Sequence, residues 1–249
     1  MHNVSWCYRT KFLQLLCKQL LRKTLLCNLL GCGFLLWGGL SFAEEYLPVA
    51  GRDYKVLTNP VATDSADKIK VIEFFWYGCP HCYTMEPYVE SWLKSKPDFV
   101  DFQRVPAPFG HIWDVHARAF YTAETMGVLD KTHQATFDAI HRDKKTLVRM
   151  QQIRKFYEKL GIDGDAFAQT FDSFIVDFRF NQAKAMIADY GLQSVPVLAV
   201  GGKYLINVTQ NSGHAGMMKT LDYLIQQEYQ LMQGPQHLST KNTATENME

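Results

Sequence analysis

Cysteine is scarce in this 249-residue sequence, and most of it lies near the N-terminus. Four of the six cysteines fall within the first 32 residues, which leaves only Cys79 and Cys82 in the rest of the chain. The disulfide framework of a small secreted domain needs more cysteines at wider spacing. The sequence has no second C-x-x-C pair to complete a four-cysteine zinc site. This single pair of cysteines therefore favours redox chemistry over a structural role.

A large net charge is absent as well. The chain has 26 basic and 25 acidic residues, a formal net charge of +1. Residues 1–43 contain five of the basic residues and none of the acidic ones, so the remainder has 21 basic against 25 acidic residues. That balance gives no support to nucleic-acid binding. The 47% hydrophobic content is ample for a packed core.

Residues 1–43 have the layout of a secretory signal peptide. Their basic stretch is followed by an apolar, leucine-rich run over 24–40 and by small residues at −3 and −1 of a cut after Ala43. We expect general secretory export and removal of this segment. A retained membrane anchor is one alternative, since the apolar run is near the lower length limit for spanning a bilayer. Lipoprotein processing at Cys32 is another.

Strand and helix patterns follow one another along the rest of the chain. We expect strands at 54–57, 69–76, 99–106, 195–200 and 203–206. We expect helices from Cys79 onward and at 112–127, 130–143, 149–160, 163–172, 174–190 and 215–232. The run 69–76 lacks polar alternation and predicts a strand buried on both faces. Gly201-Gly202 predicts a hairpin turn between the last two strands.

The order of these elements resembles the thioredoxin fold, and more closely the DsbA family of periplasmic thiol oxidases. The residues that carry the resemblance are Glu73-Phe74-Phe75, Cys79-Pro80-His81-Cys82-Tyr83 and Val195-Pro196 before the Gly-Gly hairpin. The resemblance covers roughly residues 54–232 and implies an α/β, thioredoxin-like fold with an inserted helical subdomain. The expected parts are a signal peptide (1–43), a thioredoxin-like domain in two pieces (44–110 and 191–233), the helical insertion (111–190) and a disordered tail (234–249).

The start of a helix is a favourable place for a reactive thiolate. At Cys79 the unpaired N–H groups and the positive end of the helix dipole stabilise an anion, and the N–H of Cys82 can point at its sulfur. Pro80 suits the first helical position, and His81 adds a donor and a possible positive charge. A stabilised thiolate makes the Cys79–Cys82 disulfide oxidising, with Cys82 as the buried resolving thiol. The disulfide is the redox group, and we expect no other cofactor.

Glu73 is an acid in an otherwise apolar strand. Burial of an unpaired carboxylate is costly, so this residue needs either a partner or a task. We expect burial to raise its pKa and to suit it to shuttle the Cys82 proton through water. An acid that merely forms local hydrogen bonds is the alternative. The family resemblance, which includes a buried glutamate at this place, favours the proton shuttle.

Substrate contacts are expected around a proline loop and an apolar groove. The resemblance implies a cis peptide bond before Pro196, in a loop that faces the cysteines. It also implies that the backbone of Val195 pairs with an extended substrate. From the sequence alone, we would expect this peptide bond to be trans. Trp76, Tyr77, Met217 and Met218 are the groove candidates, with core packing as the alternative for each.

The histidines do not predict a metal site. His111, His116, His133 and His141 have no metal-ligand spacing, and we expect all four to be solvated. Cys79, His81 and Cys82 offer at most three ligands. A non-enzymatic metal carrier built on these three residues remains the alternative from a different functional class.

We interpret the sequence as an exported dithiol oxidase. It would donate its disulfide to unfolded or partly folded exported proteins in the periplasm, and the resemblance implies re-oxidation by a DsbB-like membrane oxidase that passes electrons to quinone. A disulfide isomerase or reductase of the same fold is the alternative within enzymes. Only about ten residues separate the predicted cut from the first strand, too few for a dimerisation module, so we expect a monomer.

Overall fold

The computed structural model describes residues 46–65, 67–208 and 213–234; the predicted leader and nearly all of the predicted tail lie outside these residues. The strands are β1 (Lys55–Val56), β2 (Ile69–Phe75), β3 (Val100–Pro106), β4 (Val197–Val200) and β5 (Tyr204–Asn207). The helices are α2 (Pro80–Leu93), α3 (His111–Thr125), α4 (Leu129–His141), α5 (Met150–Glu158), α6 (Gly164–Phe171), α7 (Phe174–Asp189) and α8 (Gly213–Gln233). Within the described ranges, no helix is long and apolar enough to cross a membrane.

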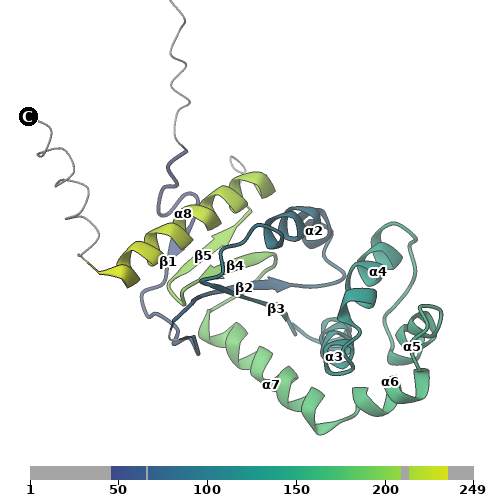
Figure 1. Cartoon of the computed structure of the whole chain (residues 1–249). Helices are drawn as coiled ribbons and strands as arrows, with labels where there is room; N and C mark the ends of the chain where they lie inside the picture. The colour runs from purple at the N-terminus through teal and green to yellow at the C-terminus, as the bar shows by residue number, and fades with distance from the viewer. Residues whose placement is uncertain (1–45, 66, 209–212, 235–249) are drawn as a thin grey trace, which may run out of the picture. The chain divides into compact units, whose positions relative to one another are not determined.

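The strands form one mixed sheet in the order β1-β5-β4-β2-β3 (Figure 1). The central strand β2 pairs in parallel with β3 and antiparallel with β4. The β4–β5 hairpin turns through Gly201 and Gly202, whose φ angles of 57° and 67° favour glycine at both positions. Strand β4 begins at Val197, two residues later than expected, because Pro196 has no N–H for the sheet.

The two faces of β2 are covered by different helices. Ile69 and Val71 pack in a core cluster with residues of α2 and α8. Ile72 and Phe74 pack on the other face, in a cluster that includes residues of α7. Side chains alternate between faces along a strand, so Glu73 lies on the α2 face with Ile69 and Val71.

The connection from β3 to β4 is entirely helical in its regular structure. It contains α3 to α7, which Figure 1 shows beside the sheet, with α4 near α2 and α7 leading back to β4. A separate apolar cluster holds α3, α4, α5 and α6 together through residues such as Ile153, Tyr157 and Phe167. The predicted α/β, thioredoxin-like fold with a helical insertion is confirmed.

Candidate active site

Cys79 is the N-cap of α2. Its sulfur accepts a hydrogen bond from the backbone N–H of Cys82 at 3.4 Å, and Pro80 occupies the first helical position. The pKa of Cys79 falls to about 6, chiefly because the Cys82 thiol donates to its sulfur. The backbone N–H groups of Cys82 and His81 and the charge of His81 act in the same direction, while burial opposes them. Cys79 is therefore the thiol that ionises first.

Cys82 has the opposite environment one helical turn later. Its side chain is completely buried, and burial raises the pKa of its thiol far above the ordinary range. The neighbouring Cys79 and the charge of Glu73 raise it further. The pair therefore combines one stabilised thiolate with one thiol that holds its proton.

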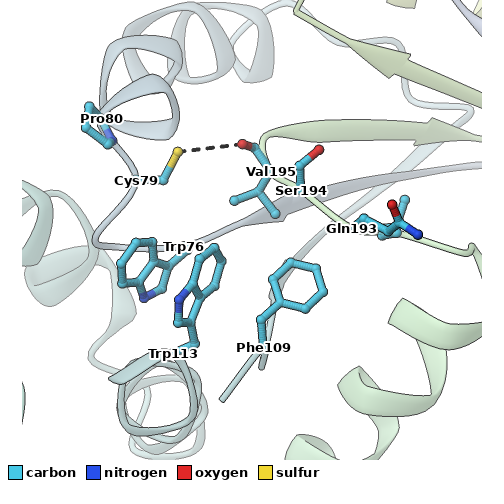
Figure 2. A pocket seen from close by; sticks show the side chains of 9 residues that line it. Trp76, Cys79, Pro80, Phe109, Trp113, Gln193, Ser194 and Val195 are labelled. Atoms are coloured by element: carbon cyan, nitrogen blue, oxygen red, sulfur yellow. Dashed lines mark hydrogen bonds between the residues drawn. The ribbon is translucent and has the colours of Figure 1, made fainter. Parts of the chain in front are cut away.

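The peptide bond between Val195 and Pro196 is cis. The Val195 carbonyl faces the first cysteine and accepts a hydrogen bond from the Cys79 thiol at 3.6 Å (Figure 2). This contact places the loop before β4 against the N-terminus of α2. The loop with Val195 and Pro196 was expected to face the cysteines, as it does.

Glu73 is buried and paired. Its Oε2 accepts from Nε of Arg104 at 3.0 Å, because the parallel register sets these two residues side by side in β2 and β3. Burial, and next the charge of Glu86, raise the pKa of Glu73 to about 7, while Arg104 opposes the rise. Sequence reasoning did not identify Arg104 or Glu86 as parts of the site. The available signals were an arginine within a strand and an acid four residues after Cys82 on the same helix.

An open pocket of about 630 Å³ lies beside Cys79. The residues that line it are Trp76, Cys79, Pro80, Phe109, Trp113, Leu192, Gln193, Ser194 and Val195. Trp76 and Trp113 stack with ring centroids 3.9 Å apart, and Phe109 meets Trp113 edge-on at 5.1 Å (Figure 2). The structure places Trp76 in the groove as expected, and α3 supplies an aromatic wall that the sequence did not reveal.

Three of the four groove candidates lie elsewhere. Tyr77 is 1% exposed and Met217 is 0% exposed, so the prediction that they line a groove is wrong. Tyr77 points toward α4, where its hydroxyl hydrogen-bonds with Nδ1 of His133 at 2.9 Å, and Met217 belongs to the core between α8 and the sheet. Met218 is half-buried against that same core and is not among the pocket-lining residues.

The expectation of four solvated histidines is also wrong. His116 and His133 are buried, and burial lowers their pKa values to about 4 and about 3. His141 is half-buried and donates from Nε2 to the Tyr77 carbonyl at 2.8 Å. Only His111 is exposed among these four. The described part of the chain has no group of three or more His, Cys, Asp or Glu side chains that could hold a metal ion.

His81 itself is exposed, at the surface of the first turn of α2. A second imidazole lies close to it, because Nε2 of His214, at the start of α8, donates to the His81 carbonyl at 3.1 Å. The rim of the site is thus formed by residues from α2 and α8 as well as from the proline loop.

Comparison with known proteins agrees with this geometry. Residues 112–224 match the DSBA-like thioredoxin domain. The thiol:disulfide interchange protein DsbA of Azotobacter vinelandii is 43% identical over 178 residues, which cover 72% of this chain and 83% of that protein. The DsbA of Pseudomonas aeruginosa is 39% identical over 193 residues, which cover 78% of this chain and 90% of that protein.

Solved structures give the same result. The crystal structure of Pseudomonas aeruginosa DsbA superposes with a TM-score of 0.72 at 38% identity, covering 77% of this chain and 98% of that one. The oxidoreductase DsbA from Xylella fastidiosa superposes with a TM-score of 0.69 at 31% identity, covering 74% and 99%. With a Cys-Pro-His-Cys pair at the start of α2 and relatives of this similarity, the chain belongs to the DsbA family and is a thiol–disulfide oxidoreductase.

Proposed function

We propose that this protein is an exported dithiol oxidase of the bacterial periplasm, which passes the Cys79–Cys82 disulfide to pairs of thiols in newly exported proteins. The observation that carries the proposal is the asymmetry of the cysteine pair. A thiolate stabilised at Cys79 is a good leaving group, and a disulfide that releases it is readily reduced by substrates.

The reaction consists of two thiol–disulfide exchanges. A substrate thiolate attacks the Cys79 sulfur, the bond between the two enzyme sulfurs breaks, and the electron pair goes to Cys82. Glu73 gives its proton to the Cys82 thiolate through water. A second substrate thiolate then attacks the substrate sulfur of the mixed disulfide, and Cys79 leaves as a thiolate. Two substrate thiols become one disulfide, and the enzyme takes up the two electrons.

Substrate binding uses the surface around Cys79. An extended, unfolded segment lies in the aromatic groove lined by Trp76 and pairs with the backbone of Val195. A groove of stacked rings accepts varied apolar side chains, which suits an enzyme with many substrates. A DsbB-like membrane oxidase restores the disulfide and passes the electrons to quinone, and the protein acts as a monomer without another cofactor.

The reduction potential is the measurement that tests this proposal. The purified protein is equilibrated in glutathione buffers, and the fraction of Cys79–Cys82 disulfide is read at each ratio, with Cys82→Ser as the control that forms no intramolecular disulfide. We expect a potential well above that of the glutathione pool. A strongly reducing potential would overturn the oxidase in favour of a reductase, and tight stoichiometric binding of Zn²⁺ by the reduced protein would favour a metal carrier.

Export is tested separately. After expression of the full chain in a Gram-negative host, we expect the protein in the periplasmic fraction with Glu44 as its first residue. A protein confined to the cytoplasm, or one that stays in the membrane fraction with residues 1–43 attached, would contradict this part of the proposal.

A further inference from the structure

One guanidinium beneath the active site is shared by three carboxylates. Arg104 donates from Nε to Glu73 at 3.0 Å, and from Nη2 to Glu86 at 2.6 Å and to Glu90 at 2.8 Å. The side chains of Glu73 and Glu86 are each 1% exposed, whereas that of Glu90 is 49% exposed. Solvent screens the charge of Glu90. The buried charges are therefore the one positive charge of Arg104 and the carboxylates of Glu73 and Glu86.

With one positive charge for two buried acids, one of the two acids is expected to stay protonated. A single positive charge neutralises one buried carboxylate, and a second buried carboxylate without compensation is costly, so it retains its proton more strongly than an exposed acid does. Each acid also has one buried oxygen with no hydrogen-bond partner among the described residues, Oε1 of Glu73 and Oε2 of Glu86. Either oxygen offers a place for the proton.

Burial raises the pKa of both Glu73 and Glu86 to about 7, and the contacts favour Glu86 as the acid that ionises first. Its Oε1 accepts the shorter of the two buried contacts from Arg104, and Nε2 of His133 lies 3.2 Å from the same oxygen. His133 is neutral because burial lowers its pKa to about 3, and its Nδ1 is bound to the Tyr77 hydroxyl. When Tyr77 donates to Nδ1, the hydrogen of His133 sits on Nε2, the nitrogen that lies 3.2 Å from Glu86 and forms no hydrogen bond within the described residues. Glu73 has only its contact with Arg104.

We propose that Glu86 is a positioning residue: in its ionised form it offsets the charge of Arg104 and so keeps a proton on Glu73 beneath Cys82. The groups that face this cluster are Glu73 of β2, Arg104 of β3, Glu86 and Glu90 of α2, His133 of α4 and Tyr77 of the loop before α2. The inference rests on the proposed function, in which Glu73 supplies the Cys82 proton. Because His133 of α4 lies beside Glu86, the helical insertion also influences the protonation of Glu73.

The order in which the two acids titrate in the unaltered protein is the first test. Side-chain carboxyl carbons of Glu73 and Glu86 in the reduced protein are followed by NMR as a function of pH, with Glu73→Gln used for assignment. We expect Glu86 to lose its proton at a lower pH than Glu73. The reverse order would overturn the proposal, and this test needs no altered side chain in the measured sample.

The second test removes the charge of Glu86. In Glu86→Gln, Arg104 faces Glu73 without a buried competitor, so the titration midpoint of Glu73 should fall by about one to three pH units. Glu90→Gln is the matched control, because it removes a charge beside the same Arg104 nitrogen at a position that solvent screens, and we expect less than a third of that fall. An unchanged Glu73 midpoint in Glu86→Gln would refute the role of Glu86.

The pH profile of the oxidase reaction separates this inference from the proposed function. If the midpoint of Glu73 and the pH profile of peptide oxidation both fall in Glu86→Gln, both proposals are supported. If the midpoint falls and the profile stays in place, Glu86 still governs the Glu73 proton, and Glu73 is not the donor to Cys82. A Glu86→Gln protein that is less stable but has an unchanged midpoint and profile would show a purely structural role, against the inference.

Discussion

At the scale of single residues, Cys79 and Cys82 are one helical turn apart and have opposite acidities. Cys79 is the N-cap of α2, where its sulfur accepts from the thiol and the backbone N–H of Cys82, whereas Cys82 is inside the helix and completely buried. Position relative to the helix end, more than residue type, therefore decides which thiol reacts.

Replacement of His81 tests its share of this effect. In His81→Leu the backbone N–H groups stay in place and the imidazole is lost, so we expect the pKa of Cys79 to rise by up to about one unit and the disulfide to become less oxidising. The pKa is read from thiolate absorbance against pH. Thr84→Ala, an exposed change in the same helix, is the control and should leave the pKa unchanged; a wild-type value in His81→Leu would refute the role of His81.

The stability of the reduced protein should depend on pH through Cys79. The pKa of Cys79 is about 6 in the folded chain, below its ordinary value of 9.0. The thiolate therefore stabilises the folded state fully above about pH 9, and this stabilisation is lost as the pH falls through about 6. The difference in free energy of unfolding between the wild type and Cys79→Ala should therefore grow between pH 6 and pH 9. Urea denaturation under reducing conditions measures it, and a constant difference would contradict the low pKa.

At the scale of secondary-structure elements, the helical insertion contributes directly to the site. Helix α3 supplies Trp113 to the groove, and α4 holds Tyr77 at both its hydroxyl and its carbonyl, through His133 and His141. The loop that leads into α2 is thus fixed from the insertion side, and the groove is formed only where the insertion meets the thioredoxin-like part.

Loss of the aromatic wall should affect large substrates selectively. Trp113→Ala removes the ring stacked on Trp76, so we expect the KM for an unfolded peptide substrate to rise about tenfold, which corresponds to about 1.4 kcal/mol. Oxidation of a small dithiol, which does not fill the groove, should change little. Phe174→Ala, an aromatic that is 82% exposed on α7, is the matched control; an equal loss with both substrates would show that Trp113 acts on the chemistry and not on binding.

At the scale of the whole molecule, the redox state and the folding equilibrium are linked. The folded structure stabilises the Cys79 thiolate, whereas the unfolded chain gives the pair ordinary thiols. By the thermodynamic cycle, a fold that stabilises the dithiol more than the disulfide makes the disulfide of the folded chain easier to reduce by the same difference in free energy.

The reduced protein should therefore be more stable than the oxidised one. Urea unfolding curves of the two forms at neutral pH measure the difference in free energy of unfolding, which should equal the difference between the reduction potentials of the folded and unfolded chains once that is converted to free energy. A more stable oxidised form would contradict the oxidase.

Local sequence patterns determined a large part of this protein. The apolar run before Cys79, Pro80 at the helix start and the Gly201-Gly202 turn predict elements that the structure contains, because strand periodicity, helix ends and tight turns depend on near neighbours in the chain. The same patterns indicated a helical insertion and a reactive first cysteine. The expectation of a cis bond at Pro196 came with the family resemblance, which also favoured the proton shuttle over a merely hydrogen-bonded acid at Glu73.

Tertiary structure alone decided which distant residues meet. Only the parallel register of β2 and β3 brings Arg104 to Glu73, and only the packing of α4 buries His133 against Tyr77. Tyr77 lies in the loop before α2, where no periodicity marks a buried side, and Met217 lies on the buried face of α8 with Leu221 and Leu224. The sequence therefore sufficed to find the thiol pair, and the contacts that control its protons required the fold, since electrostatic coupling depends on distance in space and not along the chain.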